Sequence, residues 1–400
     1  MNYLSNPFVA AGIPNPFPSK PPAKNIDFGA DGLLPFGGNS VYFVNPHLRT
    51  PYVYDYSFSV QQELAHSLIA EVTYVGSSAH GLTSLVDQNP MILGTSNRLI
   101  NSQYGLTADN GFSYLNTFEN IADQSYNGLE ASLTKRFADS RAIGNTFFTL
   151  AYTLSHSIDN ASGFQQRNFA VPYYDHRVFR ASSDQDVRNR VSFSGGWDIP
   201  FERWIGRGPK LLTRGWSLYP IVSYRTGFPL DLTAGLTAST TKPGPSGAGD
   251  PNLVRPNLVT SSVQILDPHQ TQNINGVTGN YWFNPADFAV PDYFNDPNYV
   301  PTAGQRTYGT LPRNAFRGPG RVNTDLAVAK TFNFGERLNV EFRAEAFNVF
   351  NQVEFYQPGC SPGTNGVPQC NALNIATGNL GQVTATYDPR VLQLALRVRF

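Results

Sequence analysis

The side chains that most often carry catalysis or metal binding are few in this sequence and widely spaced. No HExxH pair, GxSxG, Walker A or GxGxxG motif is present. The histidines, which lie far apart, are His47, His66, His80, His156, His176 and His269. The acidic stretch SSDQD at 182–186 could hold calcium, but Asp-rich loop tips are more often solvated turns. We therefore expect no enzymatic activity, no cofactor and no metal.

Two cysteines offer a more specific kind of chemistry. Cys360 and Cys370 lie ten residues apart in CSPGTNGVPQC, a spacing that matches no zinc or CxxC pattern. The Gly, Pro and Asn content between them indicates a loop. We expect a disulfide formed in an oxidising compartment, with two free thiols as the alternative.

Composition points to many strands joined by turns. Only 14% of the 400 residues are charged, against the usual quarter, while 13% are aromatic and 65 are Gly (35) or Pro (30). The 29 basic and 29 acidic side chains balance, so the charge does not favour nucleic acid or an anionic membrane surface. The sequence contains no run of about 18 apolar residues, so it predicts no transmembrane helix. No signal peptide begins the chain, so we expect an upstream N-terminus or a fragment.

Apolar and polar residues alternate with period two in nine segments, as in strands with two different faces. In the terminal segment the apolar side is Leu392, Leu394, Leu396, Val398 and Phe400, opposite Gln393, Arg397 and Arg399. The other eight segments are 52–60, 68–74, 127–137, 145–157, 188–199, 215–227, 323–334 and 337–350. Pro220 removes one ladder hydrogen bond from its segment, so we expect a bulge or kink there.

The connections between these segments alternate between short and long. The short connections are 63–67, 138–143, 200–212 and 334–336, and the long ones are 78–125, 158–186, 231–322 and 351–389. Outer-membrane barrels have short turns on one side and long loops on the other. A soluble sandwich has no reason to keep its long loops at one end. The pattern predicts an all-β protein, an antiparallel transmembrane β-barrel over 51–400.

The charges fit the same interpretation. Glu341, Arg343 and Glu345 share one face of a strand, and Arg397 and Arg399 share one face of another. Each Arg on a lipid face near the bilayer midplane would cost about 2–4 kcal/mol, so we expect these five side chains to face an aqueous lumen. Aromatic residues near strand ends fit interfacial girdles, although singly each could cover a soluble core.

Lys330 breaks the alternation, because it shares parity with Leu326, Val328 and Phe332. Its amine could reach the membrane interface along its apolar stem, or a bulge could invert the parity.

The C-terminus of such barrels lies in the periplasm, which fixes the direction of every strand. The long loops, and residues 1–50 as an irregular lead-in, would then be extracellular, together with Cys360 and Cys370. The segment RNAFRGPGRVN at 313–323 has three arginines that could bind an anion. Alternatively, it packs at the extracellular rim where the chain re-enters the wall.

Several segments, in order, resemble the C-terminal half of Oar-like TonB-dependent receptors. They include YNGLEASLTKRF, DVRNRVSFSGGWDIPF, GWSLYPIVSYRTGFPLDL and VEFRAEAFNVFNQVEF, and the resemblance runs from about residue 50 to the end. These outer-membrane transporters of Gram-negative bacteria often carry a carboxypeptidase-regulatory-like domain. The resemblance implies membrane lipid and the barrel-assembly machinery as partners, with the terminal aromatic strand as the assembly signal. It implies contact with the TonB system only through a plug absent from this chain, and a ligand that stays unknown.

The resemblance is incomplete. A full receptor of this type has about 22 strands around a plug, whereas this chain offers nine segments and no TonB-contacting box. Open sheet edges are not viable in lipid, so we expect an incomplete barrel that forms part of a pore wall and the surface loops for ligand uptake. The alternatives are a non-transporting surface protein for adhesion or assembly, and a secreted carbohydrate-binding β-sandwich.

Overall fold

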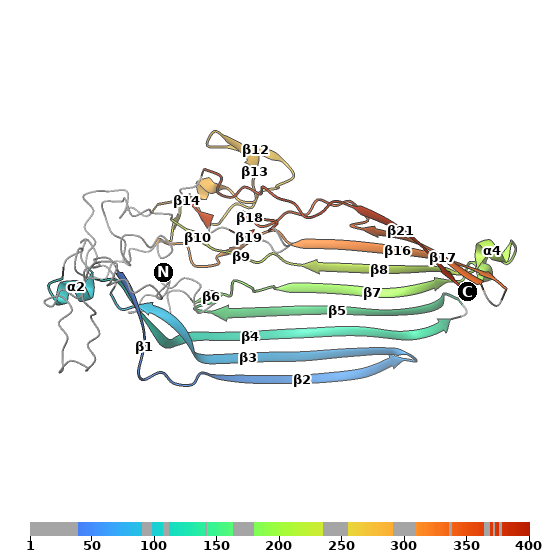
Figure 1. Ribbon diagram of the computed structural model, residues 1–400, viewed down its shortest axis with the longest axis horizontal. Coiled ribbons are helices and arrows are strands. Elements are labelled where there is room, and N and C mark those ends of the chain that lie inside the picture. The colour runs from blue at the N-terminus through green and yellow to red at the C-terminus, as the bar shows by residue number, and fades with distance from the viewer. Residues whose placement is uncertain are drawn as a thin grey trace, which may run out of the picture.

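A computed structural model describes residues 39–89, 98–106, 112–140, 142–162, 180–234, 255–290, 309–335, 338–363, 369–370, 373–375 and 378–400. Its main feature is one large, mostly antiparallel sheet whose strands run side by side along the long axis of the molecule (Figure 1). The sheet neighbours, in order, are β2 (Tyr52–Ala65), β3 (Leu68–Asp87), β4 (Phe112–Ser140), β5 (Gly144–Asp159), β7 (Asn189–Ile199), β8 (Trp216–Arg225), β16 (Arg321–Phe334), β17 (Leu338–Phe347) and β21 (Val391–Arg399). Each of the nine expected segments overlaps one of these strands.

The pairing register places the apolar positions of these strands on one face of the sheet. Leu150 in β5 lies opposite Leu133 in β4 and Phe193 in β7. At the other edge, Phe342 in β17 lies opposite Leu396 in β21. This face is open: Leu150 is 37% exposed and Leu396 is 67% exposed. A sandwich would bury it under a second sheet, so the sandwich alternative is wrong.

The two ends of the sheet differ, as the alternation of connections predicts. At one end, the turn end, lie the tight β2–β3 turn, the helix α4 (Lys210–Thr213) and the C-terminus (Figure 1). The short helix α3 (Phe201–Ile205) precedes α4 in the same connection, and Gly335 directly follows β16. Gly335 has φ +65°, which a tight strand reversal requires and which glycine adopts without strain. The opposite end, the loop end, receives the long connections. Of the helices in the described ranges, none has the length and apolarity to cross a membrane.

Two residues were expected to disturb the ladder. Pro220 interrupts it without a bulge, because Ser194 still pairs with Ile221 and Trp197 with Leu218. Lys330 keeps its place on the apolar face, since β16 and β17 pair without a register shift, so the bulge alternative is wrong.

The Lys330 side chain instead turns toward the turn end. Its amine lies 5.2 Å from the centre of the Trp216 ring and donates to the backbone carbonyls of Leu212 and Arg214. The amine thus reaches backbone acceptors at the edge of the sheet, as the interfacial alternative requires.

The expected loop 78–125 is wrong at both ends, because β3 continues to Asp87 and β4 begins at Phe112. The register shifts between Ala79 and Thr83, where Gly81 has φ +62°. Beyond this irregularity Ser84–Asp87 are all buried, so period two disappears from the sequence. Between the strands lies the short helix α2 (Leu99–Gln103).

The lead-in 1–50 also contains a strand, β1 (Asn39–Val44), which pairs in parallel with β4. Residues 1–38 lie outside the described residues. The two-residue strand β6 (Ala181–Ser182) pairs with the end of β5. The loop end therefore carries more regular structure than the sequence predicted.

The two longest connections fold together into a compact unit at the loop end, here called the cap, made of the described parts of 229–317 and 355–387 (Figure 1). Its elements are β9 (Pro229–Leu230), β10 (Leu232–Thr233), β11 (Asn257–Leu258), β12 (Thr271–Ile274), β13 (Val277–Asn280), η2 (Pro285–Asp287), β14 (Phe288–Ala289), β15 (Phe316–Arg317), β18 (Cys360–Ser361), β19 (Gln369–Cys370) and β20 (Leu373–Asn374). Strand β10 pairs with β20, which joins the two connections.

The cap has its own hydrophobic core. The buried members are Leu230, Leu232, Phe283, Phe288, Leu311, Leu373 and Leu380. Phe283 is 0% exposed, and its ring meets those of Phe288 and Phe316 edge to face at 5.6 and 5.0 Å. Aromatic pairs of this geometry add stability beyond their buried area.

Candidate functional site

The polar face of the sheet carries the charges that the sequence singled out. Glu341 in β17 lies directly opposite Arg397 in β21, while Arg399 lies opposite Asn339. On the same strand as Glu341, Arg343 Nε donates to Glu345 Oε1 at 2.6 Å. The register therefore brings these five charged side chains onto one surface, where cross-strand opposite charges are favourable.

The terminal strand β21 turns its apolar side the other way. Leu392, Leu394, Leu396 and Val398 are exposed, and the Phe400 side chain at the turn end contacts almost nothing. β21 pairs only with β17, so its outer edge has no neighbour among the described strands. The strand is thus an exposed, apolar edge, the kind of surface that soluble proteins avoid.

The segment 313–321 ties the loop end together through its three arginines. Arg313, whose side chain is 3% exposed, pairs with the carboxylate of Asp159 at the end of β5. Arg317 pairs with Asp186 and donates to the Gly227 carbonyl at 3.1 Å. Arg321 Nε donates to Glu354 at 2.9 Å. Because each arginine has a carboxylate partner, the structure favours packing over free-anion binding for this segment as a whole.

Asp186, the partner of Arg317, is almost fully buried. It is 2% exposed, and it accepts from Arg317 and from the backbone amide of Ser157 at 2.7 Å. His156 Nδ1 lies 3.1 Å from the same carboxylate. The interpretation of 182–186 as solvated turns is therefore wrong for this residue. An ion pair between a carboxylate and an arginine far away in the sequence leaves no local sequence pattern from which it could be predicted.

The described residues contain no group of three or more His, Cys, Asp or Glu side chains placed to hold a metal ion.

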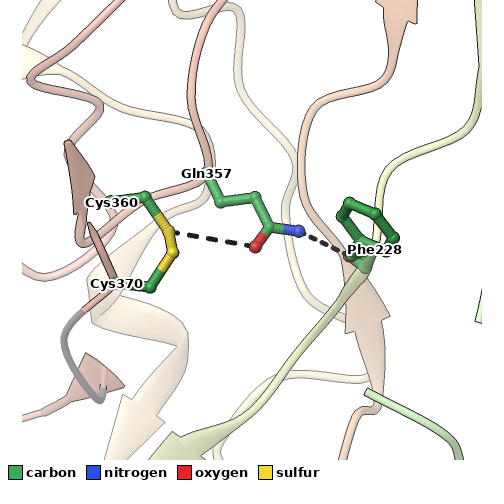
Figure 2. Close-up of a disulfide and its surroundings, with 4 residues drawn as sticks. All are labelled: Phe228, Gln357, Cys360 and Cys370. Atoms are coloured by element: carbon green, nitrogen blue, oxygen red, sulfur yellow. Dashed lines mark hydrogen bonds between the residues drawn. A yellow bond between two sulfur atoms is a disulfide. The ribbon is translucent and has the colours of Figure 1, made fainter. Parts of the chain in front are cut away.

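Cys360 and Cys370 form a disulfide inside the cap (Figure 2). They lie opposite each other in the short antiparallel pair β18–β19, with 4.0 Å between their Cα atoms. Gln357 packs beside the sulfur of Cys360, and its amide donates to the carbonyl of Phe228 at 3.3 Å (Figure 2). The crosslink therefore closes a loop within the 351–389 connection, and Gln357 links this connection to the segment that follows β8.

Two polar groups of the cap have shifted pKa values. The backbone amide of His269, and then its ring, hold the pKa of the Asp267 carboxyl below its ordinary value. Burial, followed by the neighbouring Tyr387, raises the pKa of Tyr356. The Tyr356 and Tyr387 rings stack at 4.0 Å, and the Arg321 guanidinium lies over Tyr387 at 4.1 Å.

A cavity of about 730 Å³ opens on the polar face, at the loop end. Its walls come from β4, β5, β7, β8 and the start of β16. The lining side chains are mostly polar, and they include Tyr126, Glu130, Thr153, Ser155, Gln185, Arg190, Ser223, Arg225, Phe228 and Arg321. A hollow with a mostly polar lining beside a folded cap can bind or admit a polar solute. Sequence reasoning missed it because its lining comes from five separate segments.

Comparison with known proteins identifies the type of sheet. A family model described as an outer membrane beta barrel domain matches residues 2–393. Among solved structures, the outer membrane transporter YddB from Escherichia coli is similar over 91% of this chain, with a TM-score of 0.43 and 11% sequence identity. This chain spans 34% of the length of that transporter. No curated protein matches the sequence significantly.

Proposed function

The chain belongs to the outer membrane beta barrel domain family, and we propose from that premise that it forms part of the wall of a TonB-dependent, Oar-like receptor. Its location is the bacterial outer membrane. The observation that carries the proposal is the single two-faced sheet, apolar and open on one side, polar on the other, with long connections gathered at one end. Lipid on one face and water on the other is the environment this arrangement fits.

The sheet needs further strands to become a pore. β2 and β21 each have one neighbour among the described strands, and an unpaired edge in hydrocarbon leaves backbone groups unsatisfied. In our proposal these edges join the rest of a barrel of about 22 strands. The five charges of β17 and β21 then face the lumen, and Leu392–Phe400 serves as the strand recognised by the barrel-assembly machinery.

In this orientation the turn end lies in the periplasm and the cap lies outside the cell. The cap and the long connections contact an incoming ligand, which passes along the polar face. In the proposed receptor, energy comes from the TonB system through a plug inside the completed barrel. The role is binding and transport, without catalysis.

The size of the native polypeptide tests the proposal. An antibody raised against the cap segment 255–290 is used to probe outer membranes of the source bacterium. The receptor requires a plug and further strands, so the reactive band is expected to be at least about twice the 44.0 kDa of this chain. A single band at 44.0 kDa in outer membranes would contradict it.

The cap favours one second candidate, a non-transporting surface protein for adhesion or assembly. A folded unit with a disulfide and an aromatic core is a stable surface for a partner even without a pore. The band at 44.0 kDa is the outcome that this candidate predicts.

A further inference from the structure

Three arginines stand in a row across the polar face where the cavity opens. Arg190 in β7 lies directly opposite Arg225 in β8, and Arg225 lies directly opposite Arg321 in β16. All three line the 730 Å³ cavity. Side chains directly opposite on neighbouring strands have Cβ atoms about 4.5–5.5 Å apart, and like charges at that separation are unfavourable. Negative charge beside these three arginines would therefore stabilise their arrangement.

The protein supplies that negative charge only in part. Glu354 accepts from Arg321 at 2.9 Å, and the Phe228 ring lies 4.3 Å from the Arg225 guanidinium. Glu130 lines the same cavity, but in the register Thr153 stands between it and Arg190. Within the described part of the chain, Arg190 is exposed and has no carboxylate partner.

Among the described residues, the three arginines therefore exceed the two nearby carboxylates, Glu130 and Glu354, by one charge. The planar guanidinium binds carboxylate and phosphate oxygens through two parallel hydrogen bonds. Tyr126, Thr153 and Ser223 provide neutral hydroxyls around the same space. The excess charge and the donor geometry both match an oxyanion.

We propose that this cavity is an oxyanion site, which holds a carboxylate or phosphate group of a soluble ligand at the loop end of the polar face. Arg190 and Arg225 donate hydrogen bonds to the anion. The Arg321–Glu354 pair forms one side of the site. The proposal deepens the receptor function by naming the chemical class of its ligand, and it rests on that function only for the ligand's later passage.

Arginine modification tests the site directly in membranes that contain the full chain. Phenylglyoxal reacts with accessible guanidinium groups, and mass spectrometry measures the rate at each arginine. With inorganic pyrophosphate or citrate at ten times its Kd, modification of Arg190 and Arg225 is expected to slow about tenfold relative to chloride at equal ionic strength. Arg207, exposed at the turn end, serves as the internal control and keeps its rate.

Matched variants give a second readout. Arg190→Gln removes one charged donor pair, so the Kd for the better anion, taken from the protection of Arg225, is expected to rise at least about tenfold. Arg190→Lys keeps the charge but loses the bidentate geometry. Its Kd is expected to lie between that of the unchanged protein and that of Arg190→Gln. Arg136→Gln, at an exposed position near the turn end of β4, leaves the Kd unchanged.

Two results would overturn the proposal. If Arg190 and Arg225 react freely and neither anion slows their modification, the cavity is not an oxyanion site. If both are unreactive in chloride alone while Arg207 reacts normally, protein already fills the cavity and leaves no room for a soluble anion. Stronger protection by citrate than by pyrophosphate assigns the carboxylate class, and the reverse assigns phosphate. Because the assay needs no uptake, failure of transport would leave its result standing.

Discussion

The wall and the cap of this molecule hold their apolar residues in opposite ways. In the wall, Leu394 is 70% exposed and Leu150 is 37% exposed, so the described residues leave both side chains uncovered. In the cap, Phe283 and Leu232 are 0% and 1% exposed within a packed cluster. The wall is held together by backbone hydrogen bonds between strands, and its open apolar face is suited to an apolar solvent. The cap, in contrast, buries its apolar side chains as a small water-soluble domain does. One chain is therefore adapted to two solvents along its length.

The largest effect is expected in the cap core. Phe283→Ala removes the ring that contacts Phe288 and Phe316, so the cap should lose about 3–5 kcal/mol of stability through the cavity left behind. Limited proteolysis of the full chain in outer membranes measures it, with new cleavage expected in 255–290. The wall strands should stay protected. Cleavage that spreads at once into β5 and β7 would show that the cap and the wall unfold as one unit.

A charge on the wall separates the two faces. Leu150→Arg places a guanidinium on the apolar face of the central strand β5, and the full chain should lose about 2–4 kcal/mol when lipid covers that face. Ala151→Arg, one residue along and on the polar face, is the matched control and should change little. Denaturant titration in lipid vesicles measures both. Equal losses in the two variants would mean that the faces do not differ in solvent.

The disulfide should matter to the cap alone. Replacing Cys360 and Cys370 by Ser opens a short loop, and the chain-entropy estimate for such a closure is about 2–3 kcal/mol. Hydrogen exchange is expected to rise in 351–389 while the β17–β21 ladder stays unchanged. Exchange that rises equally in that ladder would show that the crosslink also supports the wall.

The smallest effect concerns acid. The pKa of Asp267 is lowered in the folded cap, so its hydrogen bonds to His269 stabilise the turn above the ordinary carboxyl pKa of 3.8. That contribution is lost as the pH falls through the lowered folded value. The protection factor of the His269 amide should therefore be constant from pH 7 to about pH 5 and fall only below that range. Asp267→Asn should remove the pH dependence; a fall that persists in this variant would assign it to another group.

The sequence predicted the wall far better than the cap, for a physical reason. Every wall strand has one apolar and one polar face. The face on which Leu150 or Leu396 lies can therefore be predicted from the apolar residues two positions away. Even so, the sequence pattern predicts a loop where β3 and β4 extend, because the buried residues Ser84–Asp87 lack that alternation.

The partners that build the site lie far apart in the chain. Arg313 pairs with Asp159 across 154 residues of sequence. Arg225 lies between Arg190 and Arg321 only because three strands share a register. Local pattern predicts a face, but it does not predict which residues of distant strands lie side by side. The Cys360–Cys370 pair was accessible to prediction because both partners lie in one short loop.

Spin-label accessibility along β5 tests the two-solvent account most directly. Nitroxides are attached one at a time at 149–153 in the full chain in native outer membranes, where the two cysteines are already paired. We predict that oxygen, which dissolves in lipid, relaxes the labels at 150 and 152, while a water-soluble nickel chelate relaxes those at 149, 151 and 153. Uniform accessibility, or labels at 150 and 152 shielded from both reagents by protein, would contradict the account.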